Sequence, residues 1–140
     1  IDMGVEPFLV ASSLLGILAQ RLVRRLCPDC RQPYTPSDEE IAKLELDPAL
    51  VEQHGRTFWR PTGCDNCRHL GYRGRSGIYE MLVVTDEVRR LVMERKDAGT
   101  IKKQALREQM RTLRMDGGMK VLSGATSVEE VLRVTQAEAI

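Results

Sequence analysis

The longest hydrophobic run lies near the start of the chain, where residues 7–19 read PFLVASSLLGILA. Pro7 suits the first turn of a helix, and apolar residues on every side predict a helix buried on most sides. The run is shorter than the roughly 20 residues that cross a membrane. Acidic Asp2 and Glu6 precede it, unlike the basic start of a signal peptide. We expect no membrane span. We interpret the run as a helix from the interior of a larger protein, of which this chain is a fragment.

Two segments have the pattern of β-strands. In residues 20–26 (QRLVRRL) polar and apolar positions alternate weakly, and residues 78–84 (IYEMLVV) are rich in β-branched and aromatic side chains. Between them, Ser37 and Glu40 form a capping-box pattern that predicts a short helix as far as residues 47–48. We expect a loop over residues 52–63 and a tight, irregular connection over the glycine-rich residues 71–77.

From Thr85 onward the apolar spacing becomes helical. A second capping-box pattern, Ser127 with Glu130, predicts the start of the last helix. Glycines at several points separate the helical segments. We therefore expect an α+β chain whose last 55 residues form a small helical bundle.

Composition fits a soluble globular protein, with 42% hydrophobic and 29% charged residues. The formal net charge of +1 is too balanced to indicate nucleic-acid binding from bulk electrostatics. Length allows one ordinary domain or two very small ones.

The four cysteines carry the strongest chemical signal. They form two Cys-x-x-Cys pairs, Cys27/Cys30 and Cys64/Cys67, and no cysteine is left over. Zn²⁺ takes four thiolates in a tetrahedron, and a two-residue spacing lets one tight turn direct two sulfurs at one ion. Four protein ligands leave no open position, so we expect a structural zinc that stabilises a small subdomain.

Other uses of four cysteines remain open. Structural disulfides require an oxidising compartment, which nothing in the sequence indicates. Redox catalysis usually needs one pair with an activated thiolate, and iron–sulfur clusters usually have other spacings. His54 and His69 could replace a cysteine, but four cysteines already complete the ligand set.

Arginines gather around both cysteine pairs. If one ion joins the pairs, the two clusters become spatial neighbours, and arginine suits bidentate contact with phosphate or carboxylate. Solvated charge and structural ion pairs are the competing interpretation. The clusters comprise Arg21, Arg24, Arg25 and Arg31 near the first pair, and Arg68, Arg73 and Arg75 after the second.

Catalytic motifs are missing from this sequence. There is no GxxxxGK[ST] phosphate loop, no His-Glu-x-x-His, and no suggestive Ser/His/Asp set. By its own residues the chain is therefore not predicted to be an enzyme.

Three stretches, GVEPFLVASSLLGILAQRLVRRLCPDC, GCDNCRHLGYRGRSGIYEMLVVTDEVR and DGGMKVLSGATSVEEVLRVTQ, closely resemble the C-terminal third of type II secretion ATPases, the E proteins of the general secretory pathway. Type IV pilus assembly ATPases are similar and share the cysteine pairs. The resemblance implies the closing edge of a RecA-like domain over residues 1–26, a tetracysteine zinc subdomain over 27–77, and a strand plus helical subdomain over 78–140.

What the resemblance implies for function concerns mainly the longer parent protein. Such parents are cytoplasmic, peripheral at the bacterial inner membrane and hexameric, and they use ATP and Mg²⁺ to drive pseudopilus assembly together with inner-membrane platform components. Their ATP site precedes the segment matched here, so only the four cysteines carry over as functional residues. Arg21 lies in the family-like AQRLVR segment, which places it near a subunit or nucleotide contact.

Two rival functions remain at this point. A zinc ribbon that binds nucleic acid would use the arginines and Tyr72, whereas the motor interpretation expects no nucleic acid. A structural adaptor would dock a partner through the apolar residues 7–19. A phosphate loop in the preceding part of a longer protein would decide for the motor.

Overall fold

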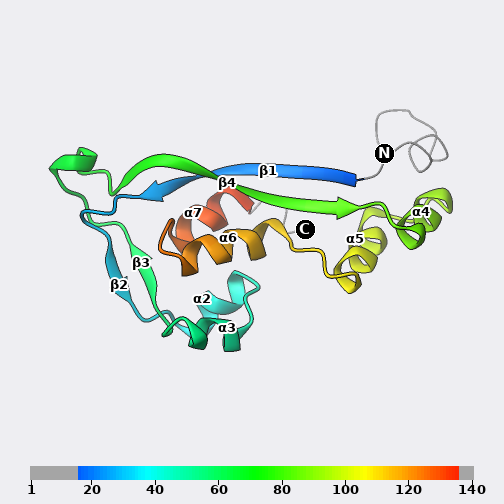
Figure 1. Ribbon diagram of the computed structural model, residues 1–140, viewed down its shortest axis with the longest axis horizontal. Helices are drawn as coiled ribbons and strands as arrows, with labels where there is room; N and C mark the ends of the chain where they lie inside the picture. Colours follow the sequence, from blue (N-terminus) through cyan, green and yellow to red (C-terminus); the bar gives the residue numbers. More distant parts are fainter. Residues whose placement is uncertain (1–15, 136–140) are drawn as a thin grey trace. The chain divides into compact units, whose positions relative to one another are not determined.

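The computed structural model describes residues 16–135 and shows a mixed α/β chain with six helices (Figure 1). The combination of strands and helices is the one that the hydrophobic pattern predicts. The elements, in order, are β1 (Gly16–Leu26), β2 (Gln32–Tyr34), α2 (Asp38–Lys43), α3 (Pro48–Gln53), β3 (Phe58–Arg60), the 3₁₀ turn η1 (Asp65–Cys67), β4 (Tyr72–Val83), α4 (Asp86–Met93), α5 (Ala98–Arg107), α6 (Leu113–Leu122) and α7 (Val128–Thr135).

The strands form two separate two-stranded sheets, β1 with β4 and β2 with β3. β1 and β4 are the long strands, with 11 and 12 residues, and Figure 1 draws them as neighbouring arrows of opposite direction. β2 and β3 pair antiparallel, with Pro33 opposite Trp59. No helix among residues 16–135 is long and apolar enough to cross a membrane.

The chain divides into two compact units. Among the described residues, the first unit comprises 16–19 and 80–112, and the second comprises 20–79 and 113–135. All four cysteines therefore belong to the second unit, together with α6 and α7.

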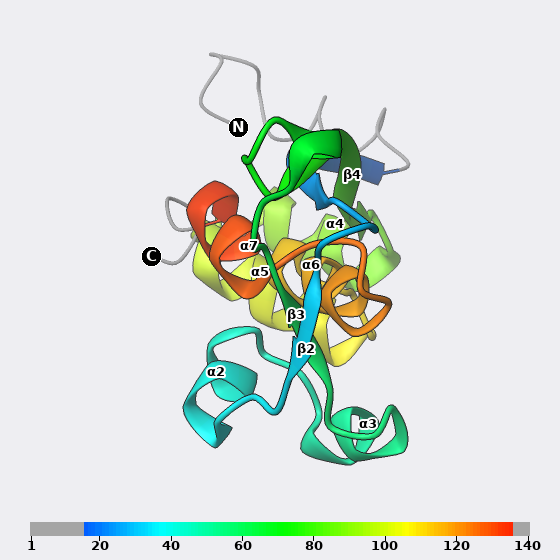
Figure 2. The same ribbon diagram turned by 90° about the vertical axis from the view of Figure 1, so that its left-hand side faces the viewer.

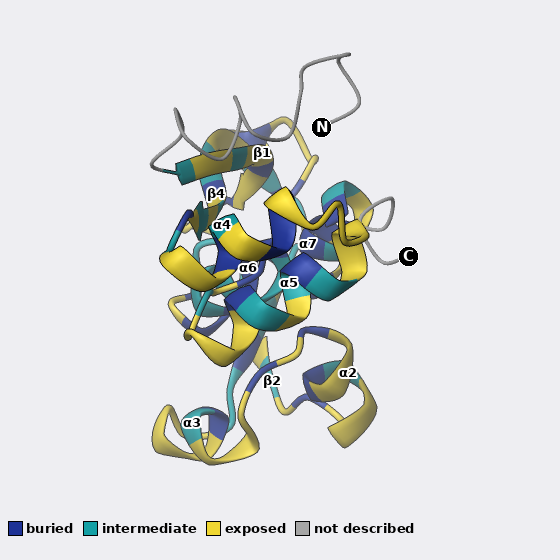
Figure 3. Ribbon diagram, turned by 90° about the vertical axis from the view of Figure 1, so that its right-hand side faces the viewer, coloured by how far each residue is buried: buried dark blue, intermediate teal, exposed yellow. Residues whose placement is uncertain are grey.

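The first unit contains the helix pair α4–α5. Thr85 and Asp97 cap the two helices, because each side chain accepts a hydrogen bond from a free N–H of the first turn. Both helices have one buried and one exposed side (Figure 3). The buried side forms an aliphatic core of Val84, Val88, Leu91, Val92 and Ile101.

In the second unit, α6 and α7 pack closely against each other. A Cβ atom at Gly117 of α6 would lie only 2.5 Å from Cγ1 of Val131, so this glycine permits the close approach. Gly118, next along α6, likewise faces the side chain of Leu46. Phe58 of β3 is fully buried and meets Tyr34 of β2 edge to face. Figure 2 shows β2 and β3 side by side, leading to α2 and α3.

Two predicted boundaries in the long sheet are wrong. Residues 16–19 belong to β1, although the apolar run predicted a helix there; residues 7–15 of that run lie outside the described residues. Residues 71–77 were expected to be irregular, yet β4 already begins at Tyr72. In both cases pairing between the two long strands overrides the local signal.

The segment between the cysteine pairs is more regular than expected. The Ser37–Glu40 capping box is present and starts α2 as predicted, but the helix ends at Lys43. Asp47 then caps a second helix, α3, instead of closing the first. Within the expected loop 52–63, residues 58–60 form β3.

The four helices that follow β4 are divided between the two compact units. α4 and α5 belong to the first compact unit, whereas α6 and α7 belong to the second. Periodicity located the helices correctly, but it carries no information about which helix pairs share a core.

Candidate metal centre

The first cysteine pair lies in the turn that follows β1. The backbone N–H of Cys30 donates to the carbonyl of Cys27 at 3.4 Å, and the N–H of Arg31 donates to the same carbonyl at 3.1 Å. Pro28 occupies the turn, where its missing N–H costs nothing. The N–H of Cys27 donates to the carbonyl of Gly71 at 2.9 Å, which fixes this turn beside the start of β4.

The second pair lies on the short turn η1. Cys64 precedes η1 and Cys67 ends it, and the N–H of Cys67 donates to the carbonyl of Cys64 at 3.2 Å. Arg68 and His69 follow in the left-handed region, with φ of 56° and 61°. This reversal leads the chain directly into β4.

The structure brings the four sulfurs together as predicted. They all lie within 4.8 Å of one another. Sγ–Sγ distances are 3.7 Å for Cys27–Cys64, 3.8 Å for Cys30–Cys67 and 3.7 Å for Cys64–Cys67. A regular tetrahedron with Zn–S bonds of about 2.3 Å has edges of about 3.8 Å. Three of the six sulfur separations match this edge, and the other three are at most 4.8 Å, so the set is compatible with the ligand sphere of one ion.

The same distances bear on the alternatives. A disulfide needs about 2.05 Å between sulfurs, and none of the four cysteines forms one. In a multi-iron cluster the thiolates bind different irons, which would separate the sulfurs more widely than the ligands of one ion. The set therefore fits a single ion that accepts soft ligands.

Backbone N–H groups surround the sulfurs, as expected for a thiolate site. Gly63 N–H donates to Cys30 Sγ at 3.3 Å. Two more donate to Cys67 Sγ, from Cys64 and from Gly71, each at 3.2 Å. These donors stabilise negative charge on sulfur before any ion neutralises it.

The thiol pKa values differ across the site. Burial tends to raise the pKa of Cys67, but the Gly71 and Cys64 N–H donors outweigh it and lower this pKa to about 6. Burial raises the pKa of Cys64 to about 11. The pKa of Cys30 is lowered too, by its contacts with Thr62 and with the Gly63 N–H, so these two thiols ionise more readily than Cys64.

Neither histidine joins the sulfur cluster among the described residues. His69 is exposed and lies 3.1 Å from a carboxylate oxygen of Asp65. His54 is exposed at the end of α3, where its Nδ1 contacts the carbonyl of Leu50. Among residues 16–135, the cluster therefore consists of the four predicted cysteines.

Several of the clustered arginines have structural partners. Arg31 donates to the carbonyl of Gly124 at 2.6 Å and stacks over the Trp59 ring at 4.3 Å. Arg73 lies 3.8 Å from Asp29. Arg21 donates to the carbonyl of Gln20; its place at a subunit or nucleotide contact stays a prediction.

The sequence did not predict the contact between Arg24 and Glu130. Glu130 is 2% exposed, and its carboxylate accepts hydrogen bonds from the Arg24 backbone N–H, from the Arg24 side chain and from Arg133. Burial opposes its ionisation, but the two guanidinium groups lower its pKa to about 2. Thr126 adds a bond from its hydroxyl to the Arg24 carbonyl at 2.7 Å, so β1 is fastened to the start of α7.

This contact changes the second capping-box prediction. Ser127 Oγ does accept from the N–H of Glu130 at 3.2 Å, as expected. The Glu130 side chain, however, bonds to arginines instead of reaching back along the helix. The partner of Glu130, Arg24, is 106 residues away in the sequence, so no local sequence pattern could predict this contact.

Known proteins are similar to this chain over nearly its whole length. A family model described as type II/IV secretion system protein matches residues 1–133. Similar proteins include type II secretion system protein E of Pseudomonas aeruginosa, 49% identical over 99% of this chain, and type II secretion system ATPase E of Vibrio cholerae, 48% identical over 96%. The type IV pilus assembly ATPase PilB of Thermus thermophilus is 44% identical over 96%. The chain spans about a quarter of the type II relatives, 26%, and 15% of PilB.

Proposed function

Since the chain belongs to the family of type II/IV secretion system proteins, we propose that it is the zinc-binding C-terminal part of a secretion ATPase. In this proposal the segment is structural and couples motion, while ATP and Mg²⁺ bind to a preceding part of the parent. The observation that carries it is the cluster of four cysteine sulfurs, all within 4.8 Å of one another, beside the end of β1 and the start of β4. Resemblance to the family supports a cytoplasmic hexamer, peripheral at the inner membrane, that powers pseudopilus assembly.

The metal in this proposal is Zn²⁺, held by Cys27, Cys30, Cys64 and Cys67. Bound there, it would supply cross-linking and no catalysis, because four thiolates leave no open coordination position. The spacing of both pairs and the sulfur distances support zinc, although a single tetrahedral iron would have a similar shape.

The chain's own contacts suggest how motion would pass through this segment. The Cys27 N–H bonds to the Gly71 carbonyl, so the end of β1 and the start of β4 are joined beside the cysteines. Arg24 of β1 is bonded to Glu130 of α7. We propose that movement of the preceding ATPase core enters through β1 and reaches α7 as a rigid-body shift. The partners that receive it would be other copies in the hexamer and inner-membrane platform components.

The proposal is tested in the full-length parent with Cys27→Ser and Cys67→Ser variants. We expect loss of one zinc per subunit, measured by mass spectrometry, and loss of secretion of exported proteins, while nucleotide binding persists. His69→Gln, next to the site, is the matched control and should keep both zinc and secretion. A zinc-free variant that secretes at the normal level would refute the coupling role.

Type IV pilus assembly is the alternative task for the same parent, since a pilus ATPase is among the similar proteins. Complementation decides between them: the full-length gene should restore export in a secretion-deficient strain and should not restore pili in a pilus-deficient one. Restored pili without restored export would reverse the assignment.

A further inference from the structure

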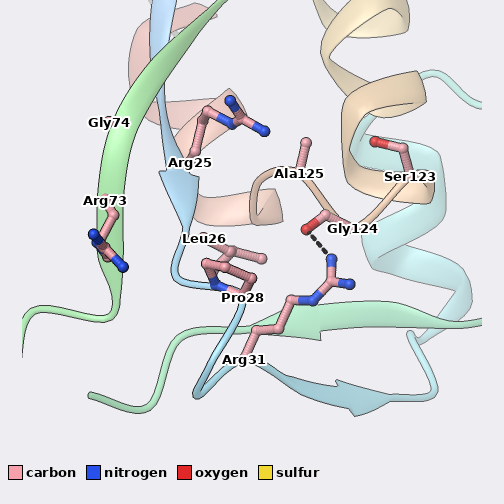
Figure 4. Close-up of a pocket in the computed structure, with 9 residues that line it drawn as sticks. All are labelled: Arg25, Leu26, Pro28, Arg31, Arg73, Gly74, Ser123, Gly124 and Ala125. Carbon is pink, nitrogen blue, oxygen red and sulfur yellow. Dashed lines mark hydrogen bonds between the residues drawn. The ribbon is translucent and has the colours of Figure 1, made fainter. Parts of the chain in front are cut away.

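A hollow of about 710 Å³ lies beside the first cysteine turn, entirely within the second compact unit. Figure 4 shows three arginines around it: Arg25 from β1, Arg31 from just after the turn, and Arg73 from β4. Its remaining wall consists of Leu26, Pro28, Gly74, Ser123, Gly124 and Ala125. No carboxylate is among these lining residues, so the hollow is positively charged.

The three arginine side chains differ in how many contacts they make with other residues of the chain. The Arg31 side chain already has partners in the wall of the hollow: it donates to the Gly124 carbonyl and stacks on the Trp59 ring. In the part of the chain that the structure describes, the Arg73 side chain has a single long contact, 3.8 Å to Asp29, and both side chains are about half exposed. Within residues 16–135, the side chain of Arg25 forms no hydrogen bond or ion pair. Two guanidinium groups are therefore available to an incoming ligand.

Gly124 keeps the third arginine in place. Its φ of +80° lies in the left-handed region, and a Cβ atom there would collide with Arg31 Nη1. The Arg31 guanidinium therefore lies directly against the α6–α7 turn, where it donates to the Gly124 carbonyl at 2.6 Å and lines one side of the hollow.

The lining distinguishes among anionic ligands. The volume falls in the range of about 300–1,000 Å³ typical for ligands much larger than an inorganic anion. No aromatic ring lines the hollow, so a nucleobase has nothing to stack on. Membrane surfaces favour basic residues flanked by apolar anchors on a raised face, whereas these arginines line a concavity. Small residues in the wall would let a peptide backbone come close, and arginine binds carboxylates bidentately.

We propose that this hollow binds an acidic segment of a partner protein, whose carboxylates contact Arg25 and Arg73 while Arg31 supports the wall. The hollow is a docking site for a peptide segment that contains Asp or Glu, and it does not include the cysteine sulfurs. It does not depend on the identity of the metal or on the secretion role proposed above, because it rests on the arginines and on the shape of the α6–α7 turn.

The test measures fluorescence anisotropy of a short labelled peptide of alternating Glu and Gly residues, titrated with the purified chain. A peptide with Gln in place of Glu is the control for charge. Arg25→Gln and Arg73→Gln remove the available guanidinium groups. Arg68→Gln is the matched control variant, because Arg68 is also exposed and also removes one positive charge but does not line the hollow. Melting curves confirm that all three variants fold.

The proposal predicts binding of the Glu peptide only, weakened about threefold to fivefold by Arg25→Gln and by Arg73→Gln, as expected for exposed charged contacts. Arg68→Gln should change the affinity less than twofold, and added salt should weaken binding. Equal weakening by Arg68→Gln would overturn the proposal, since general positive charge would then explain it. Binding to phosphatidylglycerol vesicles or inorganic phosphate that depends on Arg25, without peptide binding, would also overturn it and assign the hollow to phosphate groups.

Discussion

Replacing Glu130 with glutamine tests whether the Arg24–Glu130–Arg133 contact holds the second unit together. Glutamine keeps the size and shape of the side chain but removes the negative charge between two guanidinium groups. The Arg24 backbone N–H and both arginine side chains would lose the carboxylate that accepts their hydrogen bonds at 2.7–3.2 Å. Removing one partner of a buried ion pair leaves the others without compensation.

The size of the effect follows from the pKa of Glu130. Lowering this pKa from 4.5 to about 2 stabilises the ionised carboxylate by about 3 kcal/mol, at 1.36 kcal/mol per tenfold change in the ionisation constant. The side chains of Arg24 and Arg133 are 48% and 58% exposed, so solvent screens part of the attraction. We expect Glu130→Gln to lower the free energy of unfolding by about 2 kcal/mol at pH 7.

The sign of the pH dependence is fixed by the direction of the shift. The pKa of Glu130 is lower in the folded chain than in the unfolded chain, so its stabilisation is complete above about pH 4.5. It is lost progressively as the pH falls from about 4.5 toward 2. The stability difference between the natural chain and Glu130→Gln should therefore shrink over this range, and other acid effects cancel where the two proteins share them.

Urea unfolding followed by Trp59 fluorescence is the appropriate assay, because the single tryptophan lies in the same compact unit as Glu130. The matched control is Glu129→Gln, the exposed neighbour in α7, which should change the stability by less than about 0.5 kcal/mol. The reasoning is refuted if both variants behave alike at pH 7, or if the difference persists undiminished at low pH.

Three further predictions concern local packing, each measured by urea unfolding. Arg31→Met should cost about 1–2 kcal/mol and change the Trp59 emission, since it loses the Gly124 bond and the stacking contact; Arg60→Met, which loses only an outer stacking contact on Tyr34, should cost less. Gly124→Ala should cost about 1–3 kcal/mol because φ is +80° and Arg31 blocks the space, whereas Gly74→Ala, at φ +74° with nothing within 4 Å, should cost less. Ser37→Ala should cost about 1 kcal/mol through the lost capping box of α2, and an equal loss from exposed Thr35→Ala would contradict this.

The cysteine site was predictable because its signal is local. A Cys-x-x-Cys spacing fixes the geometry of one turn, so each pair must present both sulfurs together. Only the meeting of the two pairs needed long-range information, and the matched spacing supplied it. The family resemblance is confirmed for the same reason, since it rested on continuous stretches of sequence.

Long-range contacts account for what the sequence could not predict. Residues 16–19 are apolar enough for either a helix or a strand, and pairing with β4 makes them a strand. The glycine-rich residues 71–77 look irregular in isolation, yet the same pairing makes residues 72–77 the start of β4. Glu130 looked like a capping residue because its partner Arg24 is distant in the chain. The RecA-like edge and the domain boundaries at residues 26 and 77 stay predictions.

In the proposed function, one structural zinc ion on four thiolates holds the second unit together. Native mass spectrometry of the purified chain, with unfolding curves before and after a chelator, tests it most directly. We predict one zinc per chain, and after chelation a lower stability of the unit that contains Trp59. Absence of bound metal, or an unfolding curve indifferent to the chelator, would contradict the metal assignment and with it the proposed coupling through the cysteine site.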